Sequence, residues 1–359
     1  MRIALLGPSR HPISEPFHGG QESHVATLAG ALRHRGHHVV LYAAPGSDPR
    51  HADELVIHPP LPRFSCVAAS DINLPEPSFL TDQQAFLFVV GDLMRRGPTI
   101  DVVHNSSLHH LPLVAGSAMD IPLVATLHTP PFPWMEVGVC LADPRTIFVA
   151  VSESLAAAWT TVPRHQMRIV PNGVDVAAFG EGSGGKDLVW VGRMVPEKGA
   201  DIAIAAARVS GRRLTLIGPV SDPEWFEAAI APELGSSVTH AGHLDHHQTA
   251  RALGEALVTL VTSRWEEPFG LVAVESALTG TPVVALARGG LLEVVDEEMG
   301  VLVTPGPTGD GPDGGLARGI ERAAVLSREG VRSAAARRFS AEVMATAYEA
   351  VYHEAVAMW

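Results

Sequence analysis

Short runs of branched apolar residues alternate with helical patterns along nearly the whole chain. Each run has the length of a buried strand, and the segments between runs repeat apolar residues at the spacing of an amphipathic helix, the first over 22–35. Strands that alternate with helices predict parallel sheets built from strand–helix–strand units. This alternation occurs in both halves of the chain. In the first half the expected strands are 3–7, 38–42, 102–104, 123–127, 147–151 and 168–170. In the second half they are 188–191, 213–217, 237–240, 257–262, 283–285 and 301–303.

The length of 359 residues exceeds the size at which one hydrophobic core usually stops growing, about 250–300 residues, so two domains are expected. We predict the α/β class, with two Rossmann-like, doubly wound parallel-sheet domains that face a cleft. The first domain is expected over 1–178 and the second over 187–339. The glycine-rich run 179–186 is the expected linker, and a last helical segment within 340–359 is expected to pack back on the N-terminal domain.

Charge and cysteine content exclude several classes of protein. A net charge of −13 argues against a nucleic-acid partner, because a basic surface is needed to neutralise phosphates, so any phosphate ligand must be bound by a local cluster of cations. Cys66 and Cys140 lie far apart without metal-type spacing, which indicates neither a disulfide framework nor a metal site. No apolar segment reaches the roughly 20 residues that span a bilayer, and nothing in the sequence supports membrane association. We expect a cytoplasmic protein.

Two cations follow the first strand of the second half. In LVWVGRMVPEKG, Arg193 comes just after the strand and Lys198 lies at the start of the next helix. Side chains that leave this turn converge at the carboxyl edge of the sheet, where a diphosphate can bind. Taken alone, such charges are more often solvated surface residues.

A second segment, EPFGLVAVE at 267–275, supplies two carboxylates and a helix start. Glu267 precedes a helix opened by Phe269 and Gly270, and the free N–H groups of such a helix start favour an anion. Glu275 lies more than a turn inside the helix, where a carboxylate can accept hydrogen bonds from a hydroxyl pair such as a ribose diol. The plainer alternative is a helix whose dipole is stabilised by acids near its N-terminus.

Together with IVPNGVD at 169–175 and GGQESHV at 19–25, these motifs resemble glycosyltransferase family 4, the retaining enzymes with a GT-B fold. The resemblance covers essentially the whole chain in the expected order. It implies that Arg193 and Lys198 bind the donor diphosphate, that Glu267 contacts the transferred sugar and that Glu275 binds the ribose. It also assigns donor contacts to Phe269, Gly270 and Leu271 in a donor-binding C-terminal domain, and to Gly19, Gly20 and the sugar-facing His128 in an acceptor-side N-terminal domain.

The function implied is retaining transfer of a sugar, in keeping with a hexosyltransferase, from a nucleoside diphosphate sugar, a UDP-sugar first, to a hydroxyl of a small-molecule or glycan acceptor. Neither a cofactor nor a metal is expected. The expected catalytic residues are His128, Arg193, Lys198 and Glu267, because the reaction depends on stabilising the departing diphosphate. A nucleotide-sugar epimerase of the GT-B fold and a non-catalytic nucleotide-sugar binding protein are the alternatives.

Other motifs that would indicate a different function are incomplete or missing in this sequence. The run GEGSGGKD at 180–187 matches a P-loop except that Asp187 replaces the metal-ligating Ser or Thr, and it precedes a strand instead of following one. No G-x-G-x-x-G follows the first strand, which argues against a nicotinamide dehydrogenase, and no Asp-x-Asp occurs. The acceptor loops are expected in the proline-rich region 58–77 and in PPFPWM at 130–135, where Trp134 can stack on an acceptor ring or pack on its own domain.

Overall fold

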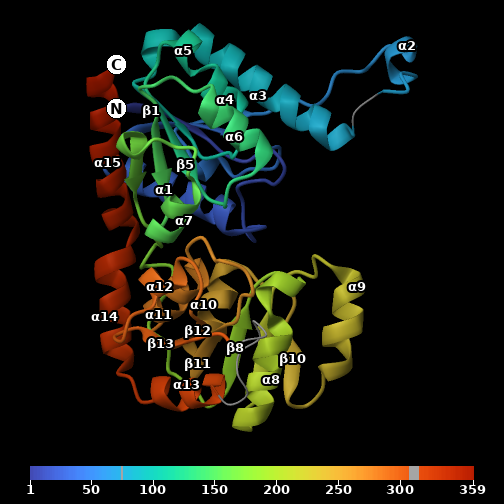
Figure 1. Ribbon diagram of the computed structural model, residues 1–359, viewed down its shortest axis with the longest axis vertical. Helices are drawn as coiled ribbons and strands as arrows, with labels where there is room; N and C mark the ends of the chain where they lie inside the picture. Colours follow the sequence, from blue (N-terminus) through green and yellow to red (C-terminus); the bar gives the residue numbers. More distant parts are fainter. Residues whose placement is uncertain (74–75, 307–314) are drawn as a thin grey trace. The chain divides into compact units, whose positions relative to one another are not determined.

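The computed structural model describes residues 1–73, 76–306 and 315–359. Parts of the proline-rich region 58–77 and of the expected second domain therefore lie outside the described residues. The chain divides into two compact units: the first contains 1–151, 156–170 and 345–359, and the second contains 152–155 and 171–344. Each unit is built around one parallel sheet with helices, so the predicted α/β class with two doubly wound sheets is confirmed (Figure 1).

The first unit contains a seven-stranded sheet in the order β3-β2-β1-β4-β5-β6-β7, with every neighbouring pair parallel. The central strand β1 pairs on both sides, with Ile3 opposite Val39 and Val102. The sequence analysis missed β3, a short edge strand of four residues, ELVI, that is only partly buried. The strands are β1 (Arg2–Leu6), β2 (His38–Ala43), β3 (Glu54–Ile57), β4 (Val102–Asn105), β5 (Leu123–Leu127), β6 (Ile147–Ala150) and β7 (Met167–Ile169).

Helices of very different length connect these strands. The first, α1, begins two residues before the predicted start, at Gly20, and ends at His34. The described helices are α1 (Gly20–His34), α2 (Cys66–Ala69), α3 (Pro77–Arg96), α4 (Leu111–Val114), α5 (Gly116–Met119), α6 (Pro133–Cys140) and α7 (Glu153–Ala158), with short turns η1 (Pro49–His51), η2 (Gly97–Thr99) and η3 (Arg164–Gln166).

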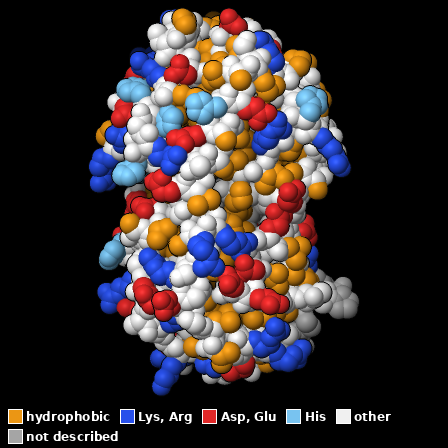
Figure 2. Space-filling model, turned by 90° about the vertical axis from the view of Figure 1, so that its left-hand side faces the viewer, with side chains coloured by type: hydrophobic (Ala, Val, Ile, Leu, Met, Phe, Trp, Pro, Cys, Tyr) orange, Lys and Arg blue, Asp and Glu red, His pale blue; other side chains and the backbone are white. Residues whose placement is uncertain are grey.

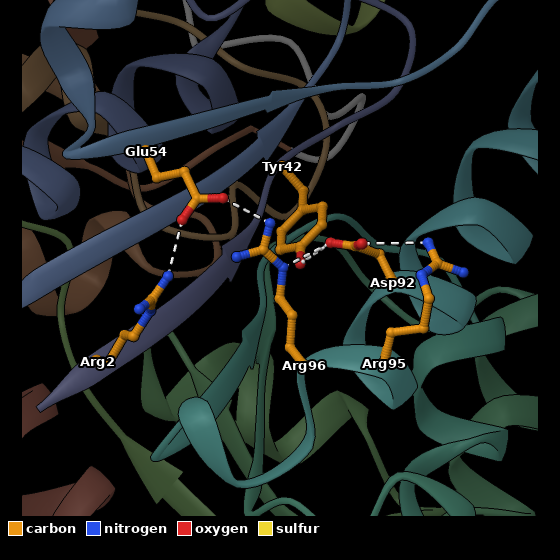
Figure 3. Close-up of polar contacts among 6 residues, drawn as sticks. All are labelled: Arg2, Tyr42, Glu54, Asp92, Arg95 and Arg96. Atoms are coloured by element: carbon orange, nitrogen blue, oxygen red, sulfur yellow. Dashed lines mark hydrogen bonds and ion pairs between the residues drawn. The ribbon is translucent and has the colours of Figure 1, made fainter.

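The long helix α3 is tied to the β2–β3 edge by a chain of polar contacts (Figure 3). The buried Tyr42 hydroxyl donates to Asp92 at 2.8 Å, and Arg96 donates to Asp92 at 2.6 Å and to Glu54 at 2.5 Å. Arg2 completes the chain with a 2.8 Å contact to Glu54. Burial is the main reason that the pKa of Tyr42 is raised, so its hydroxyl stays a donor.

The C-terminal helix α15 (Ala341–Met358) belongs to the first unit from Ala345 onward. His104 is fully buried; its Nδ1 lies 2.7 Å from the Tyr352 hydroxyl and its Nε2 lies 2.7 Å from Thr126 Oγ1. Thr126 also lies 2.8 Å from the Tyr348 hydroxyl. Burial lowers the pKa of His104 to about 3, so the ring is neutral and both of its nitrogens are used structurally.

The second unit contains a six-stranded parallel sheet in the order β10-β9-β8-β11-β12-β13. All six expected strands of the second half are present, with small shifts at their ends. The strands are β8 (Leu188–Val191), β9 (Leu214–Ile217), β10 (Val238–His240), β11 (Val258–Val261), β12 (Val283–Leu286) and β13 (Gly300–Val303). The helices and turns are η4 (Pro196–Lys198), α8 (Ala200–Ser210), α9 (Pro223–Trp225), η5 (Phe226–Ile230), η6 (Ala231–Glu233), α10 (His246–Gly254), α11 (Leu271–Leu278), α12 (Leu291–Val294), α13 (Gly315–Ala323) and α14 (Arg328–Phe339).

The glycine-rich run 179–186, which we expected to be a linker, lies inside the second unit. Gly182 N donates to Thr279 O at 3.0 Å, and Gly184 N donates to Gly254 O at 2.9 Å. A Cβ atom on Gly182 would lie 2.2 Å from the Gly254 Cα atom. The glycines therefore permit close backbone packing, and the long segment of the second unit, 171–344, begins before them.

Acidic and basic side chains lie next to one another over the face seen in Figure 2, and the described residues of that face form no broad basic stripe. None of the helices in 1–73, 76–306 and 315–359 is long and apolar enough to cross a membrane.

Candidate functional site

The two motif segments of the second half meet at the carboxyl edge of the second sheet. Strands β8 and β11 are parallel neighbours, so the loops that follow them leave the sheet at the same edge. The buried Trp190 indole donates to Thr262 Oγ1 at 3.0 Å, and Thr262 donates to Gly199 O at 2.7 Å. These contacts bring together segments that lie 69 positions apart, as measured from Lys198 to Glu267.

Lys198 and Glu267 form an ion pair at this edge. The Nζ atom lies 2.9 Å from both carboxylate oxygens, and the two side chains are 20% and 13% exposed. Ser263 Oγ and the Trp265 indole each donate to Glu267 Oε2 at 2.8 Å. Lys198 Nζ also lies 5.0 Å from the centroid of the Trp265 ring, within the range of a cation–π contact.

The sequence patterns did not identify Ser263 and Trp265. The available signal was their position: both precede Glu267 in the same short loop, and both side chains can donate a hydrogen bond to a carboxylate. The structure thus shows that Glu267 accepts from three different side chains.

Arg193 is more open than Lys198. Its guanidinium lies 3.7 Å from the Glu197 carboxylate, and 42% of the side chain is exposed. An exposed ion pair of this kind is weak, so the guanidinium can turn to a phosphate without losing a strong contact. A guanidinium can bind two phosphate oxygens in parallel.

Gly270 opens helix α11 in a conformation that requires glycine. Its φ is +98°, in the left-handed region, and a Cβ atom there would lie 2.5 Å from Leu291 Cδ2. Phe269 is buried and packs edge-on against Phe339, with ring centroids 5.6 Å apart. Leu271 is the first residue of the helix, so this stretch presents the helix start that the sequence predicted.

A second glycine pair, not identified from the sequence, supports the Glu266–Phe269 stretch. Gly289 N donates to Glu266 Oε2 and Gly290 N donates to Glu267 O, both at 2.6 Å. Gly289 has a φ of +53°, and a Cβ atom there would lie 2.4 Å from Glu267 O. The two adjacent glycines just after strand β12 were the sequence signal for this close approach.

Glu275 is buried in α11 with only 9% of its surface exposed. Within the described parts of the chain, its carboxylate oxygens are not among the fully buried polar atoms that lack a partner. Burial of the side chain raises its pKa, an effect that His246 opposes. Such a carboxylate can accept hydrogen bonds from a ligand. The ribose contact that we expected of Glu275 stays a prediction.

His128 follows strand β5 in the first unit and is neutral. Its Nε2 lies 2.7 Å from Ser106 Oγ, and its ring packs edge-on against His24 at 4.7 Å between centroids. Burial holds the pKa of His128 well below its usual value of 6.5. The ring can therefore make hydrogen bonds, but it is not a proton donor of the imidazolium type at neutral pH.

Gly19 and Gly20 lie at the start of α1, also in the first unit. Gly19 is the residue before the helix, with an extended φ of −162° that any residue adopts. The atom nearest to a Cβ on Gly19 would be Glu22 Oε2, at 3.4 Å. In the expected acceptor loop, the 56% exposed Trp134 stacks on His110 with ring centroids 5.4 Å apart. The donor contacts of the glycine pair and the acceptor contact of Trp134 stay predictions.

Two family models match the chain. "Glycosyltransferase Family 4" matches residues 18–178 and "Glycosyl transferases group 1" matches residues 175–310.

In the parts of the chain that the structure describes, no three His, Cys, Asp or Glu side chains are grouped so that they can hold a metal ion.

Curated relatives cover most of the chain. A glycogen synthase of Mycobacterium tuberculosis is 27% identical over 354 residues, covering 85% of this chain and 83% of the relative. A D-inositol 3-phosphate glycosyltransferase of Acidothermus cellulolyticus is 29% identical over 360 residues, covering 84% of this chain and 79% of the relative. Among solved structures, the Anabaena protein Alr3699/HepE in complex with UDP and glucose has a TM-score of 0.75 at 20% identity, covering 98% of this chain and 99% of the other.

Proposed function

We propose that this chain, which belongs to the family 4 glycosyltransferases and has the GT-B fold, transfers a hexosyl group from a UDP-sugar to a hydroxyl of a small-molecule or glycan acceptor. One observation carries the proposal. Arg193, Lys198 and Glu267 lie with the glycine-opened start of α11 at one edge of the second sheet, and α11 also contains the buried Glu275. The two cations suit a diphosphate. The two carboxylates, which lie at different positions along the same segment, suit the hydroxyl groups of a sugar and of a ribose.

Each group has a distinct proposed task. Arg193 and Lys198 bind the diphosphate, assisted by the N–H groups at Gly270 and Leu271. Glu267 accepts from a hydroxyl of the transferred sugar, and Glu275 accepts from the ribose. The two glutamates are not an acid–base pair, because each binds a different part of the donor.

The bond from the anomeric carbon to the diphosphate oxygen breaks with its electron pair leaving on the diphosphate. The acceptor oxygen forms the new bond, and its proton moves to the departing phosphate oxygen. Lys198 and Arg193 stabilise the charge that develops there, which is the main requirement for rate. Attack from the face that the diphosphate leaves gives retention of configuration, and the reaction needs no protein base.

Stereochemistry and metal use are tested separately. NMR of the first-formed product gives its anomeric configuration, and an inverted product would contradict retention. Full turnover in excess EDTA is expected for a metal-independent enzyme; loss of activity that Mg²⁺ or Mn²⁺ restores would contradict it. The cytoplasmic location stays a prediction.

The donor is identified by thermal shift with UDP-, GDP-, ADP- and dTDP-sugars. A ligand at one hundred times its dissociation constant adds about 2.7 kcal/mol of stability. UDP-sugars are the first choice, in line with the UDP complex of the Anabaena protein, which shares this fold. Conversion of the donor into an epimeric nucleotide sugar without an acceptor would instead support the epimerase.

The Arg193→Ala variant tests the leaving-group role. Losing one charge-assisted contact to the diphosphate should slow turnover roughly 10²-fold or more. Lys186, outside the site, provides the control variant Lys186→Ala, which also removes one cation. Unchanged turnover in Arg193→Ala, with donor binding intact, would contradict the assignment.

A further inference from the structure

We propose that Trp265 is a positioning residue for glycosyl transfer, which keeps the Glu267 carboxylate and the Lys198 ammonium in the geometry that binds the donor. The inference rests on the proposed function. It concerns a side chain that need not contact the donor itself.

Trp265 contacts both members of the ion pair. Its indole N–H donates to Glu267 Oε2 at 2.8 Å, and its ring centroid lies 5.0 Å from Lys198 Nζ. The side chain is partly buried. One rigid side chain thus contacts the carboxylate through its edge and lies near the ammonium.

The two oxygens of Glu267 are used unequally. Oε2 accepts from Lys198, Ser263 and Trp265, whereas Oε1 accepts from Lys198 within the described residues. A carboxylate oxygen has about two lone pairs, so Oε1 retains the capacity to accept a sugar hydroxyl. By donating to Oε2, the indole N–H helps to leave Oε1 as the oxygen that can accept the sugar hydroxyl.

The arrangement also prepares the pair for a diphosphate. A lysine side chain is flexible and orients a carboxylate poorly, whereas an indole has few rotatable bonds. When Lys198 turns to the phosphates, Ser263 and Trp265 can keep Glu267 in place. The ring of Trp265 limits how far the ammonium moves, because an aromatic face attracts a cation.

Two substitutions separate the functions of the indole. Trp265→Phe keeps an aromatic face but removes the N–H donor, and Trp265→Leu removes both. Trp225→Phe, in α9 of the same unit, is the matched control. In Trp265→Phe we expect kcat to fall about tenfold, because a hydrogen bond to a charged group is lost, while the donor KM changes less than about threefold. In Trp265→Leu the donor KM should rise as well.

Three further readouts distinguish positioning from a general effect on folding. Binding of UDP should change the tryptophan emission of the wild type and of Trp225→Phe, and most of that change should be lost in Trp265→Phe. Trp265→His, which keeps a ring and an N–H donor, should recover part of the lost kcat. The double variant Ser263→Ala/Trp265→Phe should lose more than the product of the single losses, because each donor partly compensates for the loss of the other at Oε2.

The outcomes are distinct. A wild-type kcat in Trp265→Phe, or equal losses of kcat in the Phe and His variants, would overturn the positioning role while leaving the glycosyltransferase assignment intact. If the wild type turned over none of the UDP-, GDP-, ADP- and dTDP-sugars with any acceptor, the proposed function would fail, and this inference with it.

Discussion

Replacing Glu275 with glutamine should stabilise the ligand-free protein against unfolding and lower its affinity for the nucleotide. The side chain is 9% exposed. Burial raises its pKa above the usual 4.5, which means that the ionised form is disfavoured in the fold. Glutamine has nearly the same shape without the charge, so the unliganded variant should melt at a higher temperature.

The binding loss follows from the same charge. Glutamine keeps one acceptor oxygen, but its NH2 group cannot accept, so one of two hydrogen bonds from a ribose diol is lost. A hydrogen bond to a charged acceptor contributes about 1.5–3 kcal/mol, so binding should weaken about 10- to 150-fold. Isothermal titration with UDP measures the change, and differential scanning calorimetry measures the stability. Glu224→Gln, the same substitution at an exposed position in α9, is the control and should change neither quantity.

The pH dependence has a definite sign. Because the pKa of Glu275 is higher in the folded than in the unfolded chain, its ionisation lowers the free energy of unfolding as the pH rises above about 4.5. The stability advantage of Glu275→Gln should therefore grow as the pH rises from about 4.5 towards the raised pKa of the folded state. A variant that is less stable than the wild type at about pH 8, or that binds UDP with wild-type affinity, would refute the reasoning.

Other predictions concern the glycine pair and the buried histidine. Gly289→Ala should destabilise the second unit by more than about 1 kcal/mol and weaken UDP binding, because φ is +53° and the new Cβ would lie 2.4 Å from Glu267 O. Gly30→Ala, in helix α1 with no atom within 4 Å of the new Cβ, should be neutral or stabilising in the same thermal melt. His104 has a pKa of about 3 in the fold against 6.5 in the unfolded chain, so below about pH 6.5 the unfolded state binds more protons. The contribution of His104 to the free energy of unfolding should thus fall by about 2 kcal/mol between pH 7 and pH 5. Urea titration should show a smaller fall over this range in His104→Gln than in the wild type, and an equal fall would contradict the reasoning.

Much of the fold could be predicted from local patterns. The six strands of the second sheet were all expected. For the buried strands the reason is that a parallel strand covered on both faces is a continuous apolar run, as in LVWV of β8 and VVAL of β12. The short, partly buried edge strand β3 was not expected. The glycine-rich run 179–186 was expected to be a linker, because a high glycine content permits flexibility. Only the packing of Gly182 on Gly254 shows that glycine there allows close backbone contact.

For the candidate site, the residues could be named from the sequence but their contacts could not. The sequence by itself singled out Arg193, Lys198, Glu267 and Glu275, because the two motifs that contain them follow predicted strands and resemble those of the family 4 glycosyltransferases. Only the tertiary structure decided how they are used: Lys198 is paired with Glu267, Trp265 contacts both, and Glu275 is buried. Hydrogen bonds, burial and the pKa values that follow from them depend on side chains brought together from distant positions, and the periodicity of a local segment carries no information about those neighbours.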